Sequence, residues 1–74
     1  MNLEAIAKAY TRSIELEEHA ELEAPALAEE ASALRADLHA LLMEALRQAG
    51  ISFADRADAA HIAFDIALGK RKTA

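Results

Sequence analysis

A regular series of apolar residues runs through the middle of the chain and constrains its fold more than any other feature. Its members alternate in spacing between four and three positions: Leu27, Ala31, Leu34, Leu38, Leu41 and Ala45. This spacing puts the side chains on one stripe of an α-helix, and such a stripe is buried when a second helix lies along it. The series therefore predicts an all-α fold in which a long central helix packs against another helix.

The short chain limits the size of any hydrophobic core. It has 74 residues and no cysteine, so neither disulfides nor thiolate-bound metals can stabilise it. A chain of this size buries only about 60% of its unfolded surface, which makes a single core marginal. Self-association is therefore the expected supplement to the core.

The sequence lacks the signals of a membrane or secreted protein. No uninterrupted apolar run approaches the roughly 18 residues of a membrane span. The first residues, Met1-Asn2-Leu3-Glu4, lack the basic flank and apolar run of a signal peptide. We therefore expect a soluble, cytoplasmic protein with no membrane partner.

The first of three expected helices covers about residues 2–22. Asn2 is a suitable N-cap, and one face carries Leu3, Ile6, Ala7, Tyr10 and Ile14. Beyond Ile14 the same face continues into glutamates. The second half of this helix therefore either rotates to present Leu16 and Ala20 or projects past its packing partner.

Pro25 separates the first helix from the second. Proline suits the first turn of a helix but not its interior, so the second helix is expected at residues 25–49. An antiparallel hairpin is the favoured arrangement. Because the linker Glu23-Ala24 contains no Gly, Asn or Ser, one long kinked helix is the alternative. Gly50 should end the second helix in a left-handed cap, with Ile51 folding back on Leu46.

The third helix is expected at residues 53–68, with Ser52 as its N-cap and Gly69 after its end. Its main packing face should hold Phe53, Ala57, Ala60, His61, Phe64 and Leu68. Ile62 and Ile66 form a smaller second stripe with Ala59 and Ala63. Residues 1–69 are thus expected to form one helical domain, followed by a basic flexible tail at residues 70–74.

The apolar surface of the second helix is wider than one neighbour can cover. In its second half, apolar residues occupy roughly 200° of arc at 100° per residue. We therefore predict a three-helix protomer, a helical hairpin plus a shorter third helix, that dimerises into a helical bundle. The predicted dimer interface or partner-binding residues are Tyr10, Met43, Phe53, Ile62 and Ile66. The alternative for each is a place in the core of its own protomer.

Negative charge is concentrated in one region of a chain whose net charge is −5. Seven acids and no base lie there: Glu15, Glu17, Glu18, Glu21, Glu23, Glu29 and Glu30. The simplest interpretation is a solvated tip that keeps the protein soluble. The alternative is an acidic docking surface for a basic partner, or a mimic of nucleic-acid charge.

Residue types that support catalysis are sparse. His61 lies between Asp58 and Asp65, at spacings that share a helix face, and this cluster could bind a divalent metal or act as a general base. A histidine at the edge of the core, hydrogen-bonded to Asp65, is the simpler interpretation. His39 is expected at the surface. Without a cysteine nucleophile or a Gly-rich phosphate loop, we expect no enzymatic activity, no metal and no cofactor.

Residues 45–52, Ala-Leu-Arg-Gln-Ala-Gly-Ile-Ser, resemble the turn of a helix-turn-helix motif. The resemblance implies a DNA-binding transcriptional regulator that uses residues 42–68. Leu46 and Arg56 depart from the motif, which favours a small residue at the first position and an apolar one at the second. The third helix also carries Asp55, Asp58 and Asp65 against Arg56 alone, whereas contact with phosphates needs Lys and Arg. Only Lys70–Lys72 could supply a basic contact, so nucleic acid is the less favoured partner.

In size and composition the chain resembles the small helical accessory proteins of phages, plasmids and bacterial regulatory systems, which block or bridge larger proteins. We therefore predict a non-enzymatic protein–protein interaction module. It would act stoichiometrically as an inhibitor or adaptor of a larger cellular protein. The alternatives are the DNA-binding regulator and a structural, self-assembling helical protein.

Overall fold

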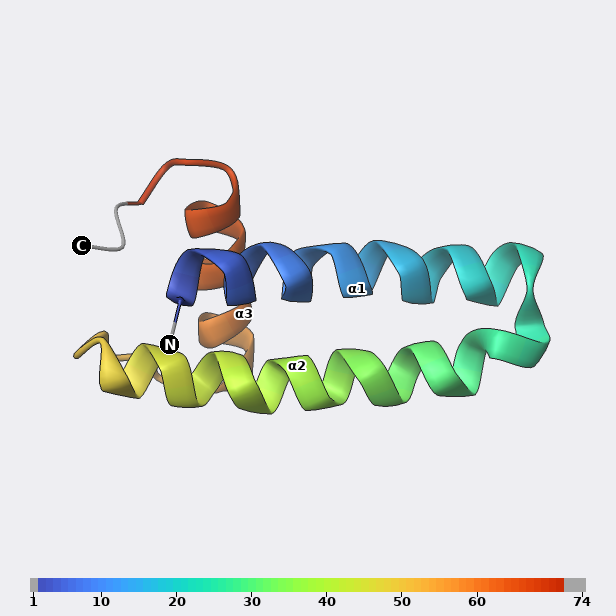
Figure 1. Cartoon of the computed structure of the whole chain (residues 1–74), viewed down its shortest axis with the longest axis horizontal. Helices are drawn as coiled ribbons and strands as arrows, with labels where there is room; N and C mark the ends of the chain where they lie inside the picture. The colour runs from blue at the N-terminus through green and yellow to red at the C-terminus, as the bar shows by residue number, and fades with distance from the viewer. Residues whose placement is uncertain (1, 72–74) are drawn as a thin grey trace.

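The computed structural model describes residues 2–71, which form three α-helices and a short 3₁₀ turn. The helices are α1 (Leu3–Glu23), α2 (Ala28–Gln48) and α3 (Arg56–Ala67), and the 3₁₀ turn is η1 (Pro25–Leu27). α1 and α2 form an antiparallel hairpin, and α3 crosses it near the open end (Figure 1). The described residues contain no β-strand. The prediction of an all-α protomer with a hairpin and a shorter third helix is confirmed.

Local sequence signals explain both ends of α1. The side chain of Asn2 accepts a hydrogen bond from the backbone N–H of Ala5 at 3.1 Å, as expected of an N-cap. At the other end, Ala24 has an extended φ of −143°. A residue before proline avoids the helical region, so Pro25 forces Ala24 out of the helix and reverses the chain without a glycine. The hairpin is therefore formed, and the long kinked helix is not.

Gly50 ends α2 in the predicted left-handed cap. Its φ is +74°, and two hydrogen bonds complete the cap: the N–H of Ile51 donates to the carbonyl of Leu46 at 2.9 Å, and the N–H of Gly50 donates to that of Arg47 at 3.0 Å. Gly69 ends α3 in the same way, with a φ of +76°.

α3 begins three residues later than predicted. Its N-cap is Asp55, whose side chain accepts from the N–H of Asp58 at 2.9 Å, whereas Ser52 lies in the preceding extended link. The carboxylate of Asp58 in turn accepts from the N–H of Ala54 at 2.8 Å. The first bond satisfies an N–H group that the helix start leaves without a partner, and the second fixes the preceding link to the first turn of the helix. They explain why Asp55 caps the helix in place of Ser52.

The core lies at the open end of the hairpin, where all three helices meet. Its buried apolar residues are Leu3, Ala7 and Tyr10 from α1, Leu42, Ala45 and Leu46 from α2, and Ala59, Ile62, Ala63 and Ile66 from α3.

The packing face predicted for α3 was therefore wrong. Ile62 and Ile66 point inward, whereas His61 and Leu68 are exposed. Two alanines on the inward stripe, Ala59 and Ala63, are fully buried, and their small side chains let α3 lie close to the hairpin.

The apolar series from Leu27 to Ala45, which lies on η1 and α2, is only partly buried. Ala45 is buried and Leu38 half-buried, but Leu27, Leu34 and Leu41 are exposed. The buried side of α2 is instead the adjacent stripe of His39, Leu42 and Leu46, because α1 and α3 together cover that side.

The second half of α1 stays alongside α2 to the tip of the hairpin. Ala20 is buried there, while Leu16 remains 51% exposed. Glu17 on α1 forms an ion pair with Arg35 on α2, with Arg35 Nε 2.6 Å from Glu17 Oε2. The alternative in which α1 projects past its partner is therefore wrong.

Candidate functional site

Four leucines on one side of the hairpin are roughly half exposed: Leu16 at 51%, Leu27 at 54%, Leu34 at 48% and Leu41 at 40%. We call this surface the leucine face. Near the tip it is hollowed into a shallow groove of about 310 Å³, lined mainly by Leu16, Leu27 and Leu34 with Ala20 and Ala31 between them. A polypeptide of this size thus presents an elongated apolar strip along both hairpin helices.

The α2 side of the leucine face has an acidic border. Its three leucines, Leu27, Leu34 and Leu41, are seven residues apart, and an acid follows each of them three residues later: Glu30, Asp37 and Glu44. Residues three apart are neighbours on a helix surface. The leucine stripe therefore runs beside a parallel row of carboxylates, all of them on exposed residues.

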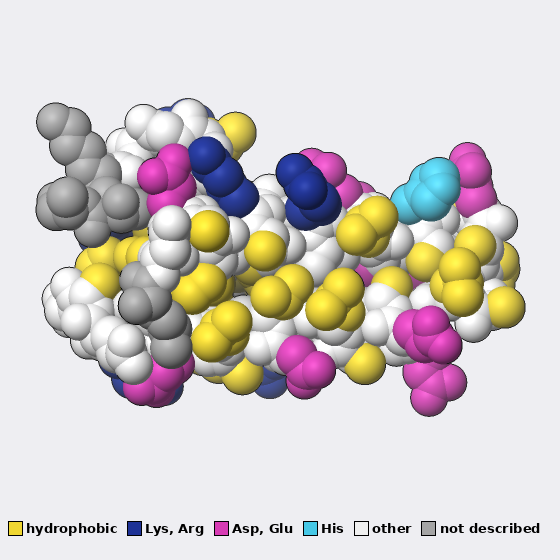
Figure 2. Space-filling model, in the orientation of Figure 1, with side chains coloured by type: hydrophobic (Ala, Val, Ile, Leu, Met, Phe, Trp, Pro, Cys, Tyr) yellow, Lys and Arg dark blue, Asp and Glu magenta, His cyan; other side chains and the backbone are white. Residues whose placement is uncertain are grey.

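The α1 side of the leucine face has a basic border. Arg12 lies one turn before Leu16, Lys8 lies one turn before Arg12, and His19 follows Leu16 by three residues. Lys8 also pairs with Glu4 at 2.9 Å, a contact within the same helix. In Figure 2, prominent basic side chains and a histidine lie over α1 with acidic side chains beside them, a hydrophobic band runs between the helices, and further acidic side chains lie over the outer side of α2. His19 Nε2 lies 3.7 Å from Glu23 Oε2 of the same helix.

A buried polar network lies behind this face. His39, expected at the surface, is only 6% exposed. Its Nε2 lies 2.9 Å from the backbone carbonyl of Arg56, and its Nδ1 lies 3.4 Å from the hydroxyl of Tyr10. Because a carbonyl only accepts, the proton is assigned to Nε2, and Nδ1 then accepts from Tyr10. The network joins all three helices and identifies His39 as a structural residue.

Tyr10 belongs to this network and to the core. It is 3% exposed, and its ring centroid lies 4.9 Å from that of His39. Burial raises the pKa of Tyr10, since the phenolate would lose its hydration, and the positive charges of Arg35 and Arg56 oppose this effect more weakly. Tyr10 is therefore a core residue of its own protomer, which was the alternative to partner binding.

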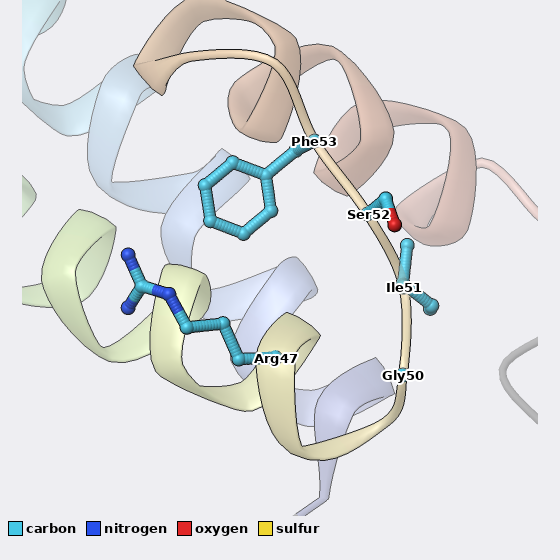
Figure 3. A pocket seen from close by; sticks show the side chains of 5 residues that line it. All are labelled: Arg47, Gly50, Ile51, Ser52 and Phe53. Carbon is cyan, nitrogen blue, oxygen red and sulfur yellow. The ribbon is translucent and has the colours of Figure 1, made fainter.

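The other residues predicted for a dimer interface do not form a common surface. Ile62 and Ile66 are 4% and 3% exposed, so they are unavailable to a second chain. Met43 and Phe53 are partly buried against the core. The Arg47 guanidinium lies over the Phe53 ring, 5.3 Å from its centroid, beside an open hollow that Gly50, Ile51 and Ser52 also line (Figure 3).

The acidic residues gather at the hairpin tip as the sequence suggests. Glu15, Glu18, Glu21, Glu23, Glu29 and Glu30 are exposed, whereas Glu17 is half-buried in its ion pair with Arg35. An acidic docking surface at the tip stays a prediction.

The cluster at His61 does not assemble. His61 is exposed, and its Nε2 lies 3.8 Å from Asp65 Oδ2, which is beyond hydrogen-bonding distance. The carboxylate of Asp58 is engaged at the start of α3. The interpretation of His61 as a hydrogen-bonded residue at the core edge was therefore wrong. Among residues 2–71, no group of three or more His, Asp or Glu side chains could hold a metal ion.

The segment that resembles a helix-turn-helix has a longer connection than that motif. Residues 49–55 separate α2 from α3, whereas the motif uses a turn of three or four residues. The start of α3 is capped by Asp55 and Asp58, which places carboxylates where a recognition helix would approach phosphates. Lys70 and Arg71 are exposed, and Lys72, with the rest of the predicted tail, lies outside the described residues.

Within the described part of the chain, no helix has the length and hydrophobicity needed to cross a membrane. Comparisons with protein families, characterised proteins and solved structures found no match to this chain. Its function is therefore inferred from its own surface.

Proposed function

We propose that this protein is a non-enzymatic protein–protein interaction module that docks on its partners through the leucine face. It would act stoichiometrically, as an inhibitor or adaptor of a larger protein. The observation that carries the proposal is the alignment of four half-exposed leucines along one side of the hairpin. Single exposed apolar residues are common on monomers, but contiguous apolar strips with polar borders are typical of interaction sites.

The shape of the leucine face favours a helical partner surface. The strip follows the helix axes, and Leu27, Leu34 and Leu41 recur at the heptad interval that matches the side chains of an adjacent helix. Amphipathic helices dock into such shallow grooves through apolar residues at helical spacing. The charged borders would then contact the polar flanks of the docked helix.

Site-specific photo-crosslinking in cells tests the proposal. A photoreactive amino acid at Leu34 should give a saturable, stoichiometric crosslink to a protein partner. The control position is Leu22, which is 83% exposed but lies roughly 120° around α1 from Leu16. Equal crosslinking from both positions, or none from Leu34, would contradict a docking role for the leucine face.

A pair of polar variants provides a second test. Glutamine is compatible with a helix, so L34Q removes apolar surface from the leucine face and L22Q removes it elsewhere. Stoichiometric capture of the crosslinked partner should be lost in L34Q and retained in L22Q. Circular dichroism of both variants should match that of the unmodified protein, since both leucines are exposed.

A further inference from the structure

We propose that a second copy of this chain occupies the leucine face, with the two hairpins face to face and their tips at the same end. In this dimer α1 of each copy lies along α2 of the other, and four helices enclose the leucines. The inference rests on the docking role proposed for the leucine face, and it names the occupant of that face in the purified protein. It is argued from the register of the hairpin and from the charges along its borders.

Two contacts within the hairpin establish which residues lie at the same height along its axis. Glu17 contacts Arg35, and Tyr10 contacts His39. By this register Leu16 lies level with Leu34, Arg12 with residues 37–40, and Lys8 with residues 41–44. Each basic residue on the α1 border thus has an acidic residue at about its own height on the α2 border.

A two-fold axis parallel to the helices of the hairpin brings residues of the two copies that lie at the same height into contact. Rotation about such an axis brings α1 of one copy over α2 of the other without a shift along the helices. Arg12 then faces Asp37 of the second copy, and Lys8 faces Glu44 of the second copy. Both pairs therefore have complementary charge. Within its own helix, Glu44 Oε2 lies 3.5 Å from Arg47 Nη1, an exposed contact. Near the tip, His19, whose Nε2 lies 3.7 Å from Glu23 Oε2 of its own helix, faces Glu30 of the second copy.

The side chains along the strip are also complementary in size. Leu16 meets Leu34 of the second copy. Leu41 meets the exposed small residues Ala5 and Ala9, which lie near its height on α1 and leave room for a larger side chain. The molecule is 38 Å long and 21 Å wide, so the dimer would have to bury most of this face to reach the roughly 800 Å² per partner of a standard interface.

The opposite orientation, with the tips at opposite ends, is disfavoured by charge. It places α2 of one copy along α2 of the other, so that Asp37 approaches Asp37 of the second copy and Glu30 approaches the height of Glu44 of the second copy. Like charges opposed across an interface are repulsive. With the tips together, Glu18, Glu21 and Glu29 point away from the interface by their helical phase, whereas Glu23 lies within about 20° of Leu16 on α1 and faces the second copy.

Sedimentation equilibrium of the purified full chain tests the dimer. The experiment is run near physiological salt, which screens repulsion between two acidic tips at one end. We expect a concentration-dependent species of twice 8.0 kDa. L34Q should raise the dissociation constant about 100-fold, and L22Q should leave it within about threefold. A monomer at every concentration, or a dimer insensitive to L34Q, would overturn the inference.

Charge reversal tests the orientation. R12E and D37R should each raise the dissociation constant about tenfold, because each change leaves two like-charged pairs in the dimer. The double variant R12E/D37R restores opposite charges across the interface and should return to near the unmodified value. Neutralising the carboxylate distinguishes the two orientations, because D37N weakens the tips-together dimer but removes the Asp37–Asp37 repulsion of the opposite one. If D37N tightens the dimer, or the double variant fails to recover, the tips-together orientation is wrong.

The two proposals fail in different ways. If the purified chain is monomeric but Leu34 still crosslinks to a larger protein in cells, the second copy is excluded and the interaction module stands. If the purified chain dimerises through the leucine face and cellular crosslinks join only two copies of it, the second copy stands and the inhibitor or adaptor role is excluded.

Discussion

His39 Nε2 donates a hydrogen bond to the backbone carbonyl of Arg56 across 2.9 Å, and this bond ties the middle of α2 to the first turn of α3. The same imidazole accepts from Tyr10 on α1. One side chain therefore holds together three helices whose apolar contacts are otherwise concentrated at the open end. The first prediction concerns this bond.

Replacing His39 with alanine should lower the free energy of unfolding by about 2–4 kcal/mol. The change leaves a cavity and removes the partner of the buried Tyr10 hydroxyl. Urea denaturation followed by circular dichroism measures the loss. The matched control is His61→Ala, which should change stability by less than about 0.5 kcal/mol because His61 is exposed. Equal losses would mean that the network contributes nothing specific.

Stability should fall in alkaline solution as Tyr10 ionises. Tyrosine in an unfolded chain has a pKa of about 10, and burial raises the pKa of Tyr10 in the folded protein. Between the two values the unfolded chain has lost a proton that the folded protein keeps, so unfolding becomes more favourable as pH rises. The contribution of neutral Tyr10 to the free energy of unfolding is therefore complete below about pH 10. It is lost as the pH rises through the pKa of Tyr10 in the folded protein.

Tyr10 is the only tyrosine in a chain without tryptophan, so near-ultraviolet tyrosinate absorbance reports its ionisation directly. Unfolding curves at a series of alkaline pH values then show whether stability follows that ionisation. Tyr10→Phe is the control, and its stability should depend less on pH in this range. If Tyr10 in the folded protein ionises at the same pH as tyrosine in an unfolded chain, burial does not raise its pKa.

Truncating leucines at two positions on α2 should separate the core from the leucine face. Leu42 is fully buried, and Leu42→Ala should cost about 2–5 kcal/mol. Leu34→Ala should cost less than about 1 kcal/mol at concentrations where the protein is monomeric, since Leu34 is half exposed. Thermal unfolding of dilute protein measures both. A large loss for Leu34→Ala in the monomer would mean that the leucine face belongs to the core of the protomer.

The position of the α3 cap can be tested with two alanine variants. Asp55→Ala should destabilise the protein by about 0.5–2 kcal/mol because it removes the acceptor for the Asp58 N–H. Ser52 lies outside the helix, so Ser52→Ala should change the free energy of unfolding by less than about 0.5 kcal/mol. The reverse ranking, measured by denaturant unfolding, would place the start of the helix at Ser52.

The residues at which the helices begin and end could largely be predicted, because the signals for them are local. Asn2, Pro25 and Gly50 act through their own backbone preferences or through a hydrogen bond to a near neighbour, and each acts in the structure as its chemistry implies. The start of α3 is the exception. There Ser52 and Asp55 are both suitable caps, and the return bond from Asp58 decides between them.

The faces of the helices could be predicted only in part, because periodicity identifies a stripe but not its neighbour. α3 has two apolar stripes, and the sequence does not say which one meets the hairpin. On α2, His39, Leu42 and Leu46 share a stripe at helical spacing, a pattern that could have placed His39 in the core. The leucine face was not predicted because its exposure depends on where α3 crosses the hairpin.

The buried core ends well before the hairpin tip, and this gives the molecule a gradient of local stability. Toward the tip, the two helices are held together with little apolar contact. The contacts there are buried Ala20, the Glu17–Arg35 ion pair and the turn at Pro25. Segments with few buried contacts open at low free energy, so amide hydrogens near the tip should exchange with solvent sooner than those of Leu42 or Ile62. The groove of the leucine face lies on this looser half. Any chain that docks there therefore also slows hydrogen exchange at the tip and couples its own binding to the local folding of the hairpin.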